Sequence, residues 1–143
     1  MSKSNVRDAA QRWARETRDI LTVSLLLSEY FGTAAERESL GKALTPLWHW
    51  IAKVEGDDRV VPGPVSEPFD FICARELATI LTPLFRLIVE PIPEFVELAA
   101  GLDERERKAI TVPFGVVSGT MARHVCKHIW KQHADLAPEG WLL

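Results

Sequence analysis

The amino-acid sequence predicts an all-α fold, an antiparallel bundle of four main helices with proline bends and one short extra helix. Apolar residues recur at alternating spacings of four and three positions, which is the period of an amphipathic helix. Capping patterns and glycines mark where these stretches begin and end. Apolar residues make up 47% of the chain and charged residues 26%, both near the averages of globular proteins. We therefore expect residues 1–143 to form a single helical domain.

The first helix is predicted to run from about Val6 to Phe31, and Gly32 is typical of a residue that ends a helix. Thr33 and Glu36 then form a capping-box pattern, in which each side chain accepts the backbone amide of the other residue. A second helix should begin there. Because the connection is so short, we expect the two helices to be antiparallel neighbours.

A short motif occurs twice, as LTPLWHWI at residues 44–51 and as LTPLFRLI at residues 81–88, 37 positions apart. Two interpretations are open. Thr45 and Thr82 could cap new helices, with Pro46 and Pro83 at the first helical position. Alternatively, each proline could bend one continuous helix. The second interpretation is favoured because the apolar register continues unchanged through both prolines, at Leu40, Leu44, Leu47, Ile51 and Val54 and again at Leu77, Leu81, Leu84 and Ile88.

The remaining segments follow from their proline, glycine and acidic residues. Residues 55–68 are rich in acids, proline and glycine, which predicts a loop. The third helix should end after Val89, and Pro93 can begin a short helix that ends near Ala100. Asp103 opens a second capping pattern and a last helical region to about residue 132, disturbed near Pro113. Residues 134–143 are expected to form a tail.

Cysteine usage and hydropathy indicate where the chain resides. The two cysteines, Cys73 and Cys126, are far apart and form no CxxC pattern, so a disulfide framework is not expected and a reducing cytoplasm fits best. Ile20–Ser28 is an apolar stretch of nine residues without a charge, whereas a membrane helix needs about 20. We expect a cytoplasmic protein without a membrane partner.

Charge is distributed unevenly along the chain. Residues 1–20 hold five bases and three acids, residues 21–102 hold six bases and twelve acids, and residues 103–133 hold six bases and three acids. In the last of these regions Arg123, Lys127 and Lys131 are spaced at i, i+4 and i+8, which places them on one face of a helix. Bases near the C-terminus of a helix complement its dipole, and this is one explanation for the basic face.

The other explanation is nucleic-acid binding. Residues 103–131 resemble a helix-turn-helix segment in outline, with a capped helix, a glycine-containing turn and a second, basic helix. The resemblance implies that Ser118, Thr120 and Arg123 face the bases and that Lys127 and Lys131 lie nearer the phosphates. Against a DNA-binding domain stands the sequence pI of about 5.8.

No metal, cofactor or catalytic motif is evident. His124 and His128 are spaced at i, i+4, but a tetrahedral zinc site needs three or four ligands and no HExxH motif accompanies them. Ser118 lacks the GxSxG elbow, and no glycine-rich phosphate loop occurs. The two thiols lie in apolar helical sequence, where cysteine usually serves packing. We predict a protein that is not an enzyme and uses no cofactor or metal.

Tryptophan and leucine point instead to protein contacts. The chain has five tryptophans, and tryptophan is enriched at interface hot spots. In the first helix, leucines continue around the sides that the apolar stripe leaves free, which predicts a second chain as cover. The candidate contact residues are Trp50, Trp130, Trp141, Leu25 and Leu26. The sequence thus favours a cytoplasmic protein-binding module, an adaptor, inhibitor or assembly subunit that forms a homodimer. The alternative is a DNA-binding regulator that uses residues 103–131.

Overall fold

A computed structural model describes residues 3–57, 59 and 73–138, and within these ranges every regular element is a helix. The all-α prediction is confirmed. None of the helices in this part of the chain is long and apolar enough to cross a membrane. The α-helices are α1 (Lys3–Phe31), α2 (Ala34–Val54), α3 (Arg75–Val89), α4 (Ile92–Ala99), α5 (Glu104–Met121) and α6 (Lys127–Gln132), with a π-helix at Ala122–Cys126 and a 3₁₀ turn at Ala134–Leu136.

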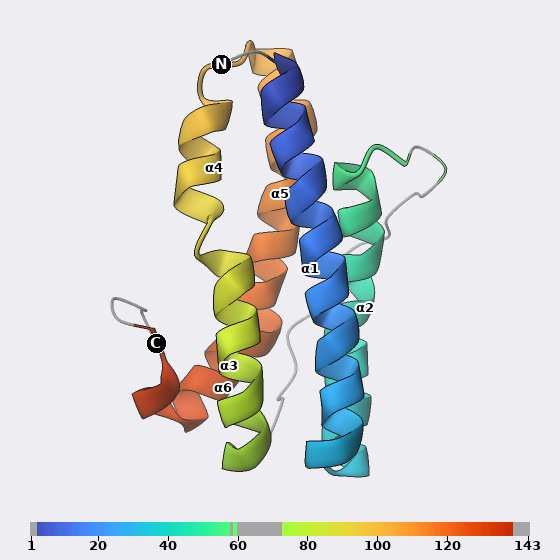
Figure 1. Cartoon of the computed structure of the whole chain (residues 1–143), viewed down its shortest axis with the longest axis vertical. Helices are drawn as coiled ribbons and strands as arrows, with labels where there is room; N and C mark the ends of the chain where they lie inside the picture. The colour runs from blue at the N-terminus through green and yellow to red at the C-terminus, as the bar shows by residue number, and fades with distance from the viewer. Residues whose placement is uncertain (1–2, 58, 60–72, 139–143) are drawn as a thin grey trace.

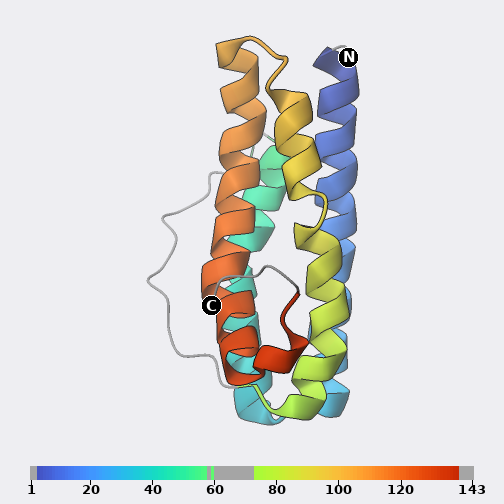
Figure 2. The same cartoon turned by 90° about the vertical axis from the view of Figure 1, so that its left-hand side faces the viewer.

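The helices stand side by side in four columns (Figures 1 and 2). One column is α1, one is α2, one is α3 continued by α4, and one is α5 continued by α6. Helix α1 contacts α2 and α3, while α5 contacts α2 and α4, and the columns in each of these pairs run antiparallel. Helices α2 and α3 run in the same direction, so the end of α2 and the start of α3 lie at opposite ends of the bundle. That parallel pair was not predicted from the sequence.

The core follows the predicted apolar stripes. On α1 the buried positions include Val6, Ala10, Trp13 and Thr17, and on α2 they include all five predicted positions from Leu40 to Val54. The largest fully buried side chains come from every column, and they are Trp130, Phe85, Phe114, Leu21, Leu40, Leu44, Leu47, Ile51, Leu77, Leu81 and Ile88. Burial of such side chains is the main term that stabilises the bundle.

The turn between α1 and α2 forms as predicted and also reaches α3. The Thr33 amide donates to Oε1 of Glu36 (3.0 Å), and the Glu36 amide donates to Oγ1 of Thr33 (3.2 Å). The other carboxylate oxygen of Glu36 accepts the amide of Ala74 (2.9 Å), just before α3 begins. Gly32 allows this close approach, because a Cβ there would lie 2.9 Å from the Ser28 carbonyl oxygen and 3.1 Å from Cδ2 of Leu77.

Polar contacts from the C-terminal region hold the same end of α3. The Cys73 amide donates to Oε1 of Gln132 (3.0 Å), and Nε2 of His133 lies 2.7 Å from the Cys73 carbonyl oxygen. Arg75 pairs with Asp135, with Nη1 2.9 Å from Oδ1. Hydrogen bonds from Arg75 lower the pKa of Asp135 to about 2, so this ion pair persists in mild acid. The start of α3 is therefore held both by Glu36 in the turn between α1 and α2 and by side chains of the C-terminal region.

The prolines of the repeated motif lie inside continuous helices, as the register predicts. Pro46 is within α2 and Pro83 is within α3. The threonine before each proline donates its hydroxyl to the carbonyl four residues earlier, from Thr45 to Gly41 (2.7 Å) and from Thr82 to Ala78 (2.8 Å). These side-chain bonds supply a hydrogen bond next to the position where proline has no amide hydrogen to donate.

The last helical region differs from the prediction in one place. Pro113 lies within α5 without ending it, whereas the helix widens later, at Ala122–Cys126. There the amide of Lys127 donates to the carbonyl of Ala122, five residues back, which is the hydrogen bond of a π-helix. The predicted loop at residues 55–68 lies mostly outside the described residues, as does part of the tail at 134–143.

Candidate partner-binding surface

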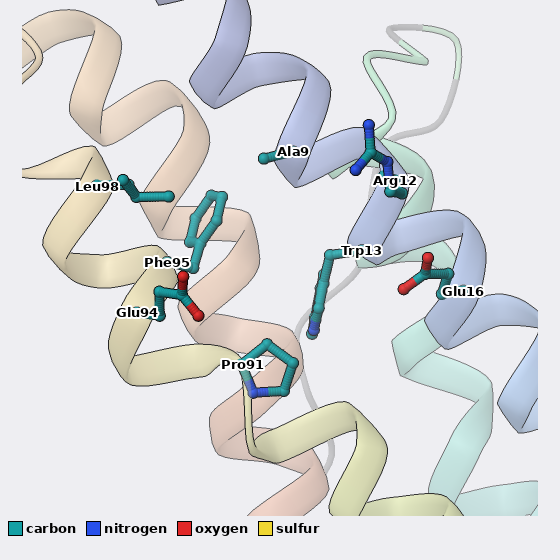
Figure 3. A pocket seen from close by; sticks show the side chains of 8 residues that line it. All are labelled: Ala9, Arg12, Trp13, Glu16, Pro91, Glu94, Phe95 and Leu98. Atoms are coloured by element: carbon teal, nitrogen blue, oxygen red, sulfur yellow. The ribbon is translucent and has the colours of Figure 1, made fainter. Parts of the chain in front are cut away.

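A groove of about 280 Å³ lies between the first half of α1 and α4 (Figure 3). Its apolar lining comes from both helices, and the charged side chains of Arg12 and Glu16 on one side and Glu94 on the other stand around it. The lining residues are Ala9, Arg12, Trp13, Glu16, Pro91, Glu94, Phe95 and Leu98. Sites for drug-sized ligands usually measure about 300–1,000 Å³, so this groove is better suited to one or two inserted side chains.

Aromatic contacts hold the walls of the groove in place. The rings of Trp13 and Phe114 are 4.3 Å apart, and those of Phe95 and Phe114 are 4.1 Å apart and stacked. Trp13 also donates its indole N–H to the carbonyl of Ile88 (3.1 Å). That carbonyl lies in the last turn of α3, where a helix leaves its carbonyls without helical partners. The break between α3 and α4 therefore both opens the groove and orients Trp13.

The second half of α1 carries exposed apolar side chains. Val23 is 42% exposed, Leu26 is 52% exposed and Tyr30 is 81% exposed. Their spacing of three and then four residues places them on one face, which we call the α1 ridge. Arg12 of the groove and Tyr30 of the ridge are 18 positions apart, about five helical turns, so the groove and the ridge share one side of α1.

The predicted contact residues lie in different environments. Leu26 is part of the ridge, whereas Leu25 is half-buried and packs against the core, as does Trp50 on α2. Trp130 is completely buried, and its indole donates to Oγ1 of Thr82 (3.1 Å). The prediction that Trp130 is a surface contact residue is wrong. Trp130 lies in α6, after the π-helix, and its side chain faces the core. Trp141 lies outside the described residues.

The predicted helix-turn-helix is also wrong as a structure. Residues 104–132 form one helical run in which α5, the π-helix and α6 follow without a turn. Thr120 is 1% exposed and cannot face a base, and the Ser118 hydroxyl donates to the Gly115 carbonyl (3.2 Å). Arg123, Lys127 and Lys131 are exposed, as the basic face requires. Of the five residues predicted to contact nucleic acid, these three are exposed as the prediction requires.

The histidines and cysteines occupy packed positions. His124 is buried within the π-helix and His128 is half-buried. Within the described ranges no three histidine, cysteine, aspartate or glutamate residues are grouped so that they could hold a metal ion. Burial and, next, the charge of Glu36 raise the pKa of the Cys73 thiol to about 12, and burial raises the pKa of Cys126 well above its usual range. Both thiols therefore stay protonated and unreactive at neutral pH.

Comparison with protein-family models, with curated proteins and with solved structures finds no significant match to the chain.

The groove could not be found from the sequence, because residues 9–16 and 91–98 meet only in the folded bundle. A partial signal was present. Trp13 falls on the apolar stripe of α1, and the EPIPEF segment ends one helix and begins another beside it. The ridge gave a clearer signal, since leucines outside the stripe predict apolar surface that one chain cannot cover.

Proposed function

We propose that this chain is a protein-binding module, acting as an adaptor, inhibitor or assembly subunit. Its contact surface is the α1 ridge together with the groove between α1 and α4. One observation supports this above the others: Val23, Leu26 and Tyr30 stand exposed on one face of a single helix. Contiguous apolar surface is uncommon on monomers, and tyrosine is enriched where proteins meet.

The shape of this surface also supports the proposal. An exposed apolar ridge and an apolar groove lie on the same side of α1, and charged side chains border the groove. An apolar centre with a charged rim is the usual anatomy of a protein interface. We place the module in the cytoplasm, since Cys73 and Cys126 are both free and buried, as in proteins kept under reducing conditions.

DNA binding is less well supported, because the turn that it required is replaced by a continuous helix. The exposed bases Arg123, Lys127 and Lys131 are explained by their place near the end of a long helical run, where cations complement the dipole.

Hydroxyl-radical footprinting in a lysate of the source cells tests the proposed function. If a protein covers the ridge, labelling of Tyr30 and Leu26 should fall several-fold below the level found for the dilute, purified folded chain. Val112 on α5 is a matched control, because it is 53% exposed and Leu26 is 52% exposed. Labelling of Tyr30 and Leu26 that matches their exposure in the free chain, at all protein concentrations, would refute the proposal.

A further inference from the structure

Two carboxylates face the groove from its opposite walls (Figure 3). Glu16 belongs to α1 and Glu94 to α4, and both side chains are directed toward the space between the two helices. Neither carboxylate forms an ion pair or a hydrogen bond with a residue in the described part of the chain. Arg12 and Glu16 have the same spacing and order as Arg86 and Glu90, which pair at 3.1 Å, yet no ion pair joins them. Both carboxylates are therefore available to a ligand in the groove.

The surface around the groove has an excess of acids. Helix α4 carries two acids, Glu94 and Glu97, and no base. The exposed charges of α1 on the side of the groove are three acids and two bases, namely Asp8, Glu16, Asp19, Arg12 and Arg15. The other arginines of this part of α1, Arg7 and Arg18, face α2, where Arg18 pairs with Glu55 (2.7 Å). Five acids and two bases give the two walls a net charge of −3, which attracts a cationic ligand.

Between the two carboxylates the groove is lined by apolar side chains. Trp13 is 6% exposed and Phe95 is 5% exposed, and their contacts with Phe114 hold both rings in place. A lysine or arginine side chain matches this arrangement, because its methylenes pack on apolar surface while its charged end stays at the rim. The volume of about 280 Å³ is sufficient for one such side chain. A neutral apolar side chain would instead take water away from Glu16 and Glu94 without pairing either of them, which is unfavourable.

We propose that the groove binds a lysine or arginine side chain of a partner protein, with its methylenes on Trp13 and its cationic group between Glu16 and Glu94. This inference rests on the proposed function and specifies the chemistry of the partner. The α1 ridge carries no charge, and it begins at Val23, seven positions or about 10 Å along the axis from Glu16. A partner segment that lies along α1 therefore combines one base for the groove with apolar side chains for the ridge.

Selection from a library of random dodecapeptides displayed on phage tests this preference, with the purified chain as bait. The enriched peptides should contain a lysine or arginine together with apolar residues. The most enriched peptide is then synthesised, and its Kd is measured by isothermal titration calorimetry. Replacing its base with norleucine keeps the methylenes but removes the charge. This change should weaken binding at least about tenfold, because the charged hydrogen bonds to the carboxylates are lost.

Matched variants of the chain locate the base in the groove. The double variant Glu16→Gln with Glu94→Gln should also bind the selected peptide at least about tenfold more weakly, and it should no longer distinguish that peptide from its norleucine form. Both positions are exposed, and glutamate and glutamine have similar helix propensities, so circular dichroism should show unchanged folding. Glu97→Gln is the control, because it removes an equal charge from α4 at a position that does not line the groove. It should change the Kd by less than about threefold.

The outcomes separate this inference from the proposed function. Enriched peptides without a base, or a Kd that the glutamine variants leave unchanged, would overturn the basic partner. Protection of Tyr30 in lysate would in that case retain the protein-binding function with a partner of different chemistry. Basic peptides bound in the groove, together with no protection of Tyr30 in lysate, would support this inference and count against the proposed function. A purified chain that selects no peptide and sediments at about twice its mass of 16.1 kDa would make a second copy the occupant and overturn the basic partner.

Discussion

The two LTPL segments share a backbone arrangement but differ in what surrounds them. In both, the first leucine and the last isoleucine are completely buried, at Leu44 and Ile51 in α2 and at Leu81 and Ile88 in α3. In both, the threonine hydroxyl donates a hydrogen bond to the carbonyl four residues back. Identical local sequence thus produces the same continuous, proline-containing helix at two places in the bundle.

The central positions show the difference. Thr45 is exposed, whereas Thr82 is buried and accepts the indole N–H of Trp130. Trp48 is half-buried, whereas Phe85 at the corresponding position is completely buried. Helix register therefore determines which positions face inward, and the neighbouring helices determine how much of each flank they cover.

The largest expected effect comes from the aromatic position of the motif. Phe85→Ala should reduce the free energy of unfolding by about 3–5 kcal/mol, because it removes a fully buried ring and leaves a cavity. Trp48→Ala at the matching position should cost less than half as much, since that ring is only half-buried. Urea unfolding followed by circular dichroism measures both values. Equal losses would mean that the two segments are buried alike, contrary to the structure.

The second prediction concerns Glu36, which joins the starts of the two helices that carry the motif. Its carboxylate accepts the amides of Thr33 and Ala74, one at the start of each helix. Glu36→Ala should therefore destabilise the bundle by about 2–4 kcal/mol, which is less than the roughly 3–6 kcal/mol of two fully buried hydrogen bonds to a charged group because Thr33 and Ala74 are exposed. Glu36→Gln keeps one acceptor oxygen and should lose less. A loss below about 0.5 kcal/mol for the alanine variant would contradict the joint role.

The contribution of Glu36 should also depend on pH. Burial raises the pKa of Glu36, but hydrogen bonds from the amides of Thr33 and Ala74 and with the Thr33 side chain lower it more, so the folded pKa lies below the usual value. A lowered folded pKa means that the stabilisation is complete above the usual glutamate pKa and is lost as pH falls through the folded pKa. The stability difference between the unaltered chain and Glu36→Gln should therefore shrink as pH falls below about 4.

These contacts show which parts of the structure could be predicted from the sequence. The capping box of Thr33 and Glu36 depends on residues three positions apart, and it was predicted correctly. The bond from Ala74 to Glu36 joins residues 38 positions apart and depends on how the columns are arranged. That arrangement is not contained in local periodicity.

The same reasoning explains the errors at the C-terminal region. The prediction placed a disturbance at Pro113, where the chain lacks an amide hydrogen, but the helix continues there and widens at Ala122–Cys126. No proline or glycine lies within that π-helical segment. The extra residue in the turn changes which side of the following helix faces the core, and local sequence could not predict that Trp130 is buried.

The third prediction tests the hydroxyl of the motif. Thr82→Val removes the group that accepts from Trp130 in the core, and it should reduce the free energy of unfolding by about 1–3 kcal/mol. Thr45→Val removes an exposed hydroxyl that makes the same hydrogen bond to the carbonyl four residues back. It should change stability by less than about 0.5 kcal/mol. The two measurements separate the shared backbone bond from the contact that only Thr82 makes. A large effect at Thr45 would show that the backbone bond itself is the important one.

The smallest effect is expected at the prolines, where the two segments should behave alike. Pro83→Ala and Pro46→Ala each restore an amide that can donate to the carbonyl four residues back, at Thr79 and at Lys42. One added hydrogen bond contributes about 0.5–1.5 kcal/mol, and the greater freedom of alanine in the unfolded chain offsets part of it. Both variants should therefore keep the fold and gain between about zero and 1 kcal/mol in urea unfolding, by similar amounts. A loss of more than about 1 kcal/mol at Pro46 alone, which is half-buried whereas Pro83 is exposed, would show that its ring contributes packing that the second segment lacks.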